Sequence, residues 1–352
     1  MKVEWKKLGD VCKVHTGSQL NRTDMLEVGA YPVVNGGREY SGFTDKHNET
    51  ANTITISQGG ESAGYVNWID VDFWAGAHCY IIENQDNCDK RFLYHALKDK
   101  ERELQTSKQG AGIPGLNRAT LYKQIIPLPT LAEQARIVGI LDTFSASIEN
   151  LKEQIAQRRK QYEHYRDKLL DLEGKEGVEM KTLGEVCDVL TGGEVPESTI
   201  KGQQVPTKSH PFAVYTNGKE TYGYADSFQV EKDAVCISSI GANTGAIFYK
   251  KGKFTPAIRL KVLISKGTIN TRFLYYAAMG IDFKGRNTGS VPNINANYVK
   301  SKSIPLPSLQ EQSRIVSILD TFEASIANLE AQLKERQKQY EYYRNKLLTF
   351  EE

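Results

Sequence analysis

The sequence contains one long segment twice, and this duplication limits the possible folds more than any other feature. Residues 133–173 and 311–351 align at an offset of 178, and 27 of the 41 positions are identical. Upstream, shorter matches keep the same order in both halves, as in 126–129 and 304–307. A repeat of this kind marks a duplicated structural unit. The chain is therefore predicted to be one half-unit doubled, in the order globule, helix, globule, helix.

Each copy of the repeat carries the signals of a long helix. Thr130 and Ser308 each follow a proline and precede a glutamate by three residues, which is the capping-box pattern of a helix start. Apolar residues then recur at alternating four- and three-residue steps over about five heptads, which predicts a coiled-coil seam. The seam comprises Ile137, Leu141, Phe144, Ile148, Leu151 and Ile155 in the first copy, and Ile315, Leu319, Phe322, Ile326, Leu329 and Leu333 in the second.

The two apolar stripes need a surface to cover them. At 1.5 Å per residue each helix would be roughly 60 Å long. The simplest burial is one helix against the other, and the alternative is that each helix lies on its own globule. Arg158 and Arg336 interrupt the two seams at the same heptad. Such a residue fixes register or partner choice, or extends its charged end to water while its stem packs.

The globular blocks, 1–130 and 174–308, contain short β-branched runs separated by Gly, Asn and Asp. These runs predict strands, and two amphipathic segments predict helices. The fold class is therefore α+β, with two globular α/β domains alternating with long helices at 131–173 and 309–352, and with 173–177 as the linker between the halves. Strands are expected at 33–34, 53–56, 77–82, 234–237 and 258–262, and the short helices at 91–98 and 271–279.

The composition is that of an ordinary soluble chain. Hydrophobic residues make up 39% and charged residues 25%, and no apolar run approaches the roughly 20 residues that span a bilayer. The first residues have no apolar signal core, so a cytoplasmic protein with no membrane partner is expected. The five cysteines form no Cys-x-x-Cys pair and are predicted to be buried free thiols: Cys12, Cys79, Cys88, Cys187 and Cys236.

Motifs of catalytic, cofactor or metal sites are not found. The segment 110–115 matches G-x-G-x-x-G, but it follows polar residues and contains Pro114, so a nucleotide site is not expected there. The six histidines have no metal-ligand spacing, and His78 and His95 are predicted to be packing or surface residues. Two copies of a block without a visible site favour binding over catalysis, so we expect no catalytic residues, no metal and no cofactor.

What the globular blocks do contain is polar, amide-rich loops beside glycine. Glycine allows close backbone approach, and Asn, Gln and Arg make the paired hydrogen bonds that distinguish base edges in DNA. Any single loop could equally be a hairpin turn, but three such loops recur at matched places in both halves. The candidate DNA-binding residues are Asn35, Gly36, Gly37, Arg38, Gln58, Gly60, Ser62, Lys108, Gln109, Asn217, Lys219, Ser239, Asn243, Thr244, Lys284, Arg286, Asn287 and Thr288.

Pro-Leu-Pro, then Leu-x-Glu-Gln-x-Arg-Ile-Val-x-Ile-Leu-Asp, then a heptad helix, all present twice, resembles the DNA-specificity (S) subunits of type I restriction-modification systems. The most specific parts are 126–144 and 304–322. The resemblance implies that 1–130 and 174–308 are target recognition domains, each reading one half of a split double-stranded DNA sequence. It also implies that 131–173 and 309–352 are conserved helical regions that pair as an antiparallel coiled coil.

The resemblance further implies partners. Two methyltransferase (M) subunits would dock on this chain, and restriction (R) subunits would join through them, with catalysis belonging to those partners. The nearly identical patches 158–163 and 336–341 are the expected seats for the M subunits. The alternative is that each patch is a solvated charged face.

The charge distribution bears on DNA binding. The overall net charge of +2 counts by itself against a polyphosphate partner, but 174–308 holds 17 basic and 11 acidic residues whereas 1–130 holds 15 and 16. The second block offers seven cations for phosphates: Lys250, Lys251, Lys253, Arg259, Lys261, Lys284 and Arg286. The first block must gather its cations on one face. A coiled-coil protein-interaction adaptor without DNA readout is the alternative function.

Overall fold

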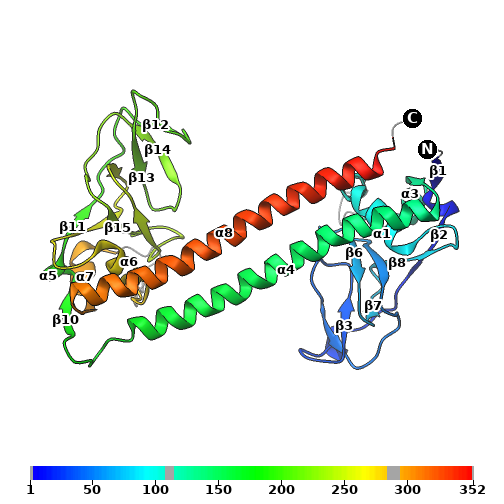
Figure 1. Ribbon diagram of the computed structural model, residues 1–352, viewed down its shortest axis with the longest axis horizontal. Coiled ribbons are helices and arrows are strands. Elements are labelled where there is room, and N and C mark those ends of the chain that lie inside the picture. Colours follow the sequence, from blue (N-terminus) through cyan, green and yellow to red (C-terminus); the bar gives the residue numbers. More distant parts are fainter. Residues whose placement is uncertain (1–2, 108–114, 284–293, 351–352) are drawn as a thin grey trace. The chain divides into compact units, whose positions relative to one another are not determined.

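The computed structural model describes residues 3–107, 115–283 and 294–350 (Figure 1). The chain divides into two compact units. Unit 1 is Met1–Glu153 with Glu330–Glu352, and unit 2 is Gln154–Leu329. Each unit thus holds one globular part together with portions of both long helices.

The two long helices begin where the sequence predicts. Helix α4 is Leu131–Leu170 and helix α8 is Leu309–Leu348. The hydroxyl of Thr130 accepts from the backbone N–H of Glu133 at 3.4 Å, as in an N-cap. The Glu133 carboxylate pairs with Arg136 at 2.6 Å rather than completing the capping box. The start of α8 repeats both features with Ser308, Glu311 and Arg314.

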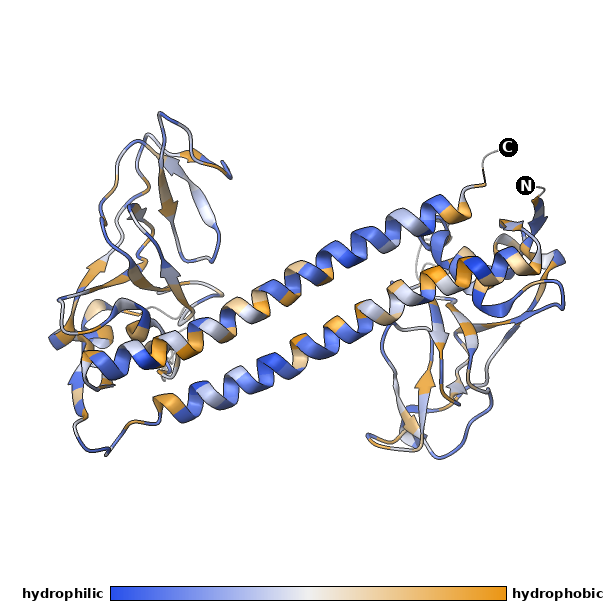
Figure 2. Ribbon diagram, viewed as in Figure 1, coloured by the Kyte–Doolittle hydropathy of each residue, from blue (hydrophilic) through white to orange (hydrophobic). Residues whose placement is uncertain are grey.

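Helices α4 and α8 pack together in antiparallel directions, which confirms the predicted pairing. In unit 1, Phe144 from the first half of α4 meets Tyr343 near the end of α8. In unit 2, Tyr165 near the end of α4 meets Phe322 from the first half of α8. Apolar and polar positions alternate along both ribbons, as a seam requires (Figure 2).

The predicted seam residues differ in what covers them. Ile137 and Leu141 are fully buried in the core of the unit 1 globular part, together with Leu348 of α8. Ile315 and Leu319 are buried in the same way in the core of unit 2. Each helix therefore packs at its start on the globular part before it and at its end on the other globular part, and between these regions it packs on the opposite helix. Of the other seam residues, Ile148, Leu151 and Ile155 are buried, and Phe144, Phe322, Ile326, Leu329 and Leu333 are half-buried.

The globular part of unit 1 contains a four-stranded antiparallel sheet in the order β2-β8-β5-β6, a smaller sheet β4-β3-β7 and the pair β1-β9. Helix α1 packs on β5, β6 and β8. The elements are β1 (Glu4–Lys7), η1 (Leu8–Asp10), β2 (Cys12–Thr16), η2 (Arg22–Asp24), β3 (Tyr31–Val34), β4 (Gly42–Thr44), β5 (Thr53–Ser57), β6 (Val66–Ile69), β7 (Trp74–Ala75), β8 (Cys79–Asn84), α1 (Lys90–Asp99), α2 (Glu101–Thr106), α3 (Arg118–Tyr122) and β9 (Ile125–Leu128).

The globular part of unit 2 has the same order in its central four-stranded sheet, and its second sheet has one additional edge strand. Its sheets are β11-β18-β15-β16, β12-β14-β13-β17 and β10-β19, with α6 packed on β15 and β16. The two globular parts therefore share one topology although their sequences differ. The elements are β10 (Glu179–Thr182), α5 (Leu183–Val186), β11 (Cys187–Thr191), β12 (Ile200–Lys201), β13 (Phe212–Tyr215), β14 (Thr221–Ala225), β15 (Ala234–Ile237), β16 (Ile247–Lys250), β17 (Phe254–Pro256), β18 (Lys261–Ser265), α6 (Thr271–Met279), α7 (Ala296–Lys300) and β19 (Ser303–Leu306).

Two strand predictions are wrong in their bounds. The run 77–82 was expected to form a strand, but β8 begins at Cys79 because residues 77–78 form a turn. The apolar run 258–262 was expected to form a strand, but β18 begins only at Lys261. Ile258 and Arg259 have φ angles of 51° and 61°, in the left-handed region that β-branched residues rarely adopt. The turn before β18 is therefore held by its surroundings rather than by local preference.

The cysteine prediction is confirmed. All five cysteines are free and buried. Burial raises the pKa of each thiol to about 12, so these groups stay protonated near neutral pH. In the part of the chain that the structure describes, no helix is both long enough and apolar enough to cross a membrane.

A buried glutamine ties the start of each long helix to its globular part. The side chain of Gln134 accepts from the backbone N–H of Asp89 at 2.7 Å and donates to the carbonyl of Pro129 at 2.9 Å. Gln312 makes the same two bonds, at the same lengths, with Asn270 and Pro307. Both glutamines are fully buried. The glutamine of the repeated Glu-Gln pair thus has a structural role that sequence reasoning did not assign.

Candidate functional site

Three loops of unit 1 meet at one end of its sheets. They follow β3, β5 and β7, and they include Asn35, Gly36 and Gln58. The backbone N–H of Gln58 donates to the carbonyl of His78 at 3.0 Å, and Ser57 bonds the carbonyl of Gly36. Gly36 has a φ of 86°, and a Cβ there would lie 2.6 Å from the His78 carbonyl oxygen. A side chain at this position would push the loops apart.

The equivalent three loops of unit 2 meet through Asn217. Its amide oxygen accepts from the backbone N–H of Ser239 at 2.8 Å, and its amide nitrogen donates to the carbonyl of Ile258. Asn243 donates to the Asn217 carbonyl at 3.2 Å, and the Ser239 hydroxyl donates to the Arg259 carbonyl at 2.6 Å. The loops after β13, β15 and β17 are thus joined, as in unit 1. We call each set the loop cluster of its unit.

The candidate DNA-binding residues fall into two groups in these clusters. The first group forms side-chain hydrogen bonds within the protein and so fixes the shape of the loops. It comprises Asn217, Ser239, Asn243 and Thr244. The exposed cations are Arg38 in unit 1 and Lys219 and Arg259 in unit 2. Arg38 lies over the ring of Tyr65, with 5.5 Å from its guanidinium carbon to the ring centroid. Gly37, Gly60 and Ser62 lie in the unit 1 loops.

The third candidate loop of each half lies outside the described residues. This concerns Lys108 and Gln109 in the first half and Lys284, Arg286, Asn287 and Thr288 in the second. The residues that follow these segments join the clusters: Leu116 donates to the carbonyl of Gln58 at 2.8 Å, and Ile294 donates to that of Ser239 at 2.9 Å. The loops carrying His78 and Ile258 were missed from sequence because their role depends on long-range backbone contacts.

Two of the lysines expected to contact phosphates are buried. Lys250 is 7% exposed, donates to the carbonyl of Lys219 at 2.6 Å and lies 3.8 Å from the ring centroid of Tyr215. Lys261 is 5% exposed and donates to the hydroxyl of Thr191 at 3.2 Å. Burial lowers the pKa of both lysines. The phosphate-binding role assigned to these two residues from sequence is therefore wrong, because their side chains are buried and their ammonium groups bond to other protein groups.

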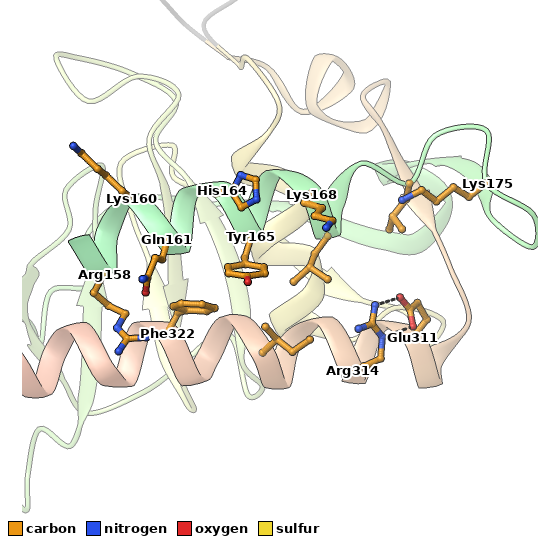
Figure 3. Close-up of a pocket in the computed structure, with 13 residues that line it drawn as sticks. Arg158, Lys160, Gln161, His164, Tyr165, Lys168, Lys175, Glu311, Arg314 and Phe322 are labelled. Carbon is orange, nitrogen blue, oxygen red and sulfur yellow. Dashed lines mark hydrogen bonds and ion pairs between the residues drawn. The ribbon is translucent and has the colours of Figure 1, made fainter. Parts of the chain in front are cut away.

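The expected partner patches lie beside a repeated aromatic contact between the helices. In unit 2, Tyr165 stacks on Phe322 with 5.4 Å between ring centroids, and Arg158 lies 5.8 Å from the Phe322 centroid (Figure 3). In unit 1, Tyr343 stacks on Phe144 at 5.2 Å, and Arg336 lies 5.6 Å from the Phe144 centroid. The arginines that interrupt the seam are thus held by cation–π contact with the opposite helix.

A groove of about 1070 Å³ opens beside this contact in unit 2 (Figure 3). Its floor is apolar, with Tyr165, Leu169, Ile318 and Phe322, and its rim is basic. The basic side chains are Arg158, Lys160, Lys168, Lys175 and Arg314, with Arg314 paired to Glu311. In unit 1, a smaller cavity of about 550 Å³ opens at the equivalent place. It is lined by Phe144, Arg336, Lys338, Gln339 and Tyr343, which match Phe322, Arg158, Lys160, Gln161 and Tyr165.

The comparison with known families decides the identity. Residues 2–158 and 175–338 match the family model of the type I restriction modification DNA specificity domain. The chain belongs to this family. It is a specificity subunit with DNA target recognition as its function, and the relatives are non-catalytic components of restriction-modification complexes.

Curated relatives agree over nearly the whole length of this specificity chain. A putative type I specificity subunit of Mycoplasma pneumoniae is 26% identical, and the match covers 99% of this chain and 98% of the relative. The EcoR124I/EcoR124II specificity subunit of Escherichia coli is 29% identical, with 99% and 95% covered. The crystal structure of the S subunit from M. genitalium shares the fold, with a TM-score of 0.77, 23% identity and coverage of 100% and 97%.

Proposed function

We propose that this specificity subunit reads a bipartite, asymmetric DNA target, with one half read by each loop cluster and an unread spacer between them. The observation that carries the proposal is the loop cluster itself, which is built twice on one strand order. Central sheets with the same strand order hold equivalent loops together at the same strand ends, and such loops on a rigid scaffold commonly carry binding residues. The half-sites differ because the loops carry different side chains.

The residues of the two clusters support different readings of the two half-sites. The loops of unit 1 carry Arg38 and Gln58, whereas those of unit 2 carry Lys219 and Arg259 around a framework fixed by Asn217. Arginine and amide side chains make two-pronged contacts with purine edges, while lysine binds phosphates and single acceptors. The spacing between half-site centres is expected to be near one turn of DNA, about 10 base pairs.

The test is single-molecule sequencing of methylated DNA from cells that carry this chain with its methyltransferase. Two unlike short motifs separated by a fixed unread gap are expected. Exchange of the residues 174–308 for those of another specificity subunit should then change one motif only. A continuous or palindromic motif would contradict the proposal.

We also propose that two copies of a methyltransferase (M) subunit dock on the paired helices, one in each unit, and that restriction (R) subunits join through them in the cytoplasm. The supporting observation is the repeated Phe-Tyr-Arg contact with matching basic residues beside it. One partner surface can bind at two places only if both present the same side chains. The apolar floor with a basic rim in unit 2 suits an apolar segment flanked by acidic residues.

A coiled-coil adaptor without DNA readout is the competing function. It is distinguished by the salt dependence of DNA affinity, because phosphate contacts by lysine and arginine release counterions. A steep fall in affinity with rising salt supports DNA reading, whereas DNA affinity that does not change with salt supports the adaptor.

A further inference from the structure

Unit 1 contains a cavity of about 760 Å³ apart from its loop cluster. Its walls come from β6, α1 and the portions of α4 and α8 that belong to this unit. Aromatic rings and cations line it together, including Trp68, Tyr94, Arg91 and Tyr340. The carboxylates of Asp70, Glu149 and Glu341 also line it, so the cavity combines flat apolar surface with charges of both signs.

Arg91 is the side chain of interest because its bonds use only one end of the guanidinium group. Its Nε donates to both carboxylate oxygens of Asp142, at 2.8 and 3.1 Å. Its guanidinium carbon lies 4.4 Å from the Trp68 ring centroid and 4.8 Å from that of Tyr94. Its Nη1 is buried without a hydrogen-bond partner among the described residues. Buried guanidinium donors are ordinarily satisfied, so this nitrogen calls for an acceptor.

The second copy of the repeat shows a carboxylate bound to the terminal end of the equivalent guanidinium group. Arg272 stands where Arg91 does: its Nε donates to Asp320 at 2.7 Å, and its guanidinium carbon lies 4.9 Å from each of the Tyr249 and Tyr275 ring centroids. Here the terminal Nη2 also bonds the carboxylate of Glu323 and, at 3.0 Å, the hydroxyl of Tyr276. In unit 2 a carboxylate from α8 thus accepts a hydrogen bond from the terminal Nη2 of the arginine.

The corresponding position of α4 in unit 1 is Ser145, which has no carboxylate. In unit 2, Glu323 bridges Arg272 and Tyr162, whose hydroxyl lies 3.3 Å from the Glu323 carboxylate. In unit 1, Ser145 hydrogen-bonds Tyr340, the counterpart of Tyr162. The bridge to the arginine is missing, and Ser145 lines the cavity.

The other cations at this cavity already have carboxylate partners. Lys98 pairs with Glu101 at 2.5 Å, Lys152 with Glu149 at 2.7 Å, and Arg344 with Asp99 at 3.1 Å. In each of these pairs the carboxylate offsets the charge of the cation. Among the described residues that line the cavity, the buried side-chain atom without a hydrogen-bond partner is Nη1 of Arg91.

We propose that the unit 1 cavity is a binding site for one carboxylate group, which takes the place that Glu323 fills in unit 2 and bonds the terminal nitrogens of Arg91. A carboxylate matches the guanidinium fork and is the group that the repeat itself uses there. The carboxylate belongs either to a free small acid or to an Asp or Glu side chain of a bound partner chain. In both cases the recognising residues are the same.

The experiment titrates the purified full-length chain with sodium acetate, at constant ionic strength kept with sodium chloride, and follows tryptophan fluorescence. Trp68 reports on the site because Arg91 lies on its ring. A saturable change is expected for the unsubstituted chain. Ser145→Glu supplies the carboxylate internally and should weaken acetate binding at least tenfold, while raising the melting temperature without acetate. Ala146→Glu, an exposed position on the same helix, is the matched control and should leave binding unchanged.

Three outcomes overturn the proposal: no saturable response in the unsubstituted chain, equal binding by the Ser145→Glu variant, or equal loss in the Ala146→Glu control. A second measurement decides the source of the natural carboxylate. Acetate binding is repeated with the chain assembled with its partner subunits. Loss of the acetate response on assembly assigns the site to a partner side chain, and an unchanged response assigns it to a free acid.

Discussion

The ring of Phe144 stacks on that of Tyr343, with 5.2 Å between centroids and 24° between planes. Tyr165 and Phe322 repeat the contact at 5.4 Å and 28°, but the helices exchange roles, since α4 supplies the Phe in unit 1 and the Tyr in unit 2. This exchange is what two nearly identical helices produce when they pair in opposite directions. The duplicated sequence is thereby converted into a duplicated surface.

The Phe144–Tyr343 contact should contribute measurable coupling to stability. Phe144→Leu and Tyr343→Leu, made singly and together, form a double-mutant cycle. Aromatic pairs contribute about 0.5–1.5 kcal/mol beyond the burial of their area. Urea unfolding of the four proteins should give a coupling energy in that range. Strictly additive effects of the two substitutions would show that the stacking adds nothing.

Gln134→Ala should destabilise unit 1 by about 1–3 kcal/mol, because it leaves the N–H of Asp89 and the carbonyl of Pro129 without their buried partner. Gln312→Ala should have the same effect in unit 2. The measurement is the free energy of unfolding in urea. Gln310→Ala, at an exposed position, is the control and should change stability by less than about 0.5 kcal/mol.

His95 should make stability depend on pH. It is fully buried between Asp142, at 2.8 Å, and Tyr340, at 3.3 Å, with Arg91 and Arg344 nearby. Burial lowers the pKa of His95, against the raising effect of Asp142. The unfolded chain therefore binds the extra proton first, so this contribution to stability is complete above about pH 6.5 and falls as the pH drops below it.

The check on His95 is a comparison with His95→Tyr, which installs the residue that the repeat has at position 276. Unfolding free energies at pH 7.5, 6.5 and 5.5 should show the unsubstituted chain losing stability relative to the variant, by at most about 1.4 kcal/mol per pH unit. Parallel pH profiles of the two proteins would mean that the pKa of His95 is the same in the folded and unfolded states.

Asn217→Ala should affect only one half of the DNA target. The substitution removes the bonds that join the loops after β13, β15 and β17, so we expect unit 2 to lose about 1–3 kcal/mol of stability and the complex to lose affinity for one half-site. Binding is measured on oligonucleotides in which one or the other half-site is scrambled. Equal weakening on both half-sites would contradict separate readout by the two clusters.

Charge reversal beside the two aromatic contacts should remove partner subunits stepwise. Lys160→Glu in unit 2 and Lys338→Glu in unit 1 occupy matching positions of the two surfaces. Native mass spectrometry of the co-expressed complex should show one methyltransferase subunit with either variant and none with both. Lys123→Glu, at an exposed position outside α4 and α8, is the control and should retain both.

The long helices could be predicted from sequence because their signals are local. A capping hydroxyl after proline and a 3.5-residue apolar period fix both the start and the buried face of α4 and α8. The seam pattern did not reveal which surface covers each residue. Ile137 and Phe144 both occupy seam positions, but Ile137 lies in a globular core whereas Phe144 contacts the opposite helix. That difference depends on the three-dimensional course of the chain.

The loop clusters could be predicted only in part. Asn35, Gln58 and Asn217 were found because amides beside glycine are typical of functional loops. The third loop of each cluster escaped notice, since His78 and Ile258 act through backbone carbonyls that any residue type possesses. The left-handed turn at Ile258 also contradicts its local strand preference, so a sequence pattern alone could not place it.

The pairing of β1 with β9, and of β10 with β19, has a consequence for how such a chain can evolve. Glu4 lies opposite Leu128 and Glu179 lies opposite Leu306, so each globular part enters and leaves through two adjacent antiparallel strands. A globular part whose first and last strands pair with each other can be replaced by another of the same topology without disturbing the segments outside it. Recombination between related genes could then supply a new DNA-reading module in one step, while the helices keep their register.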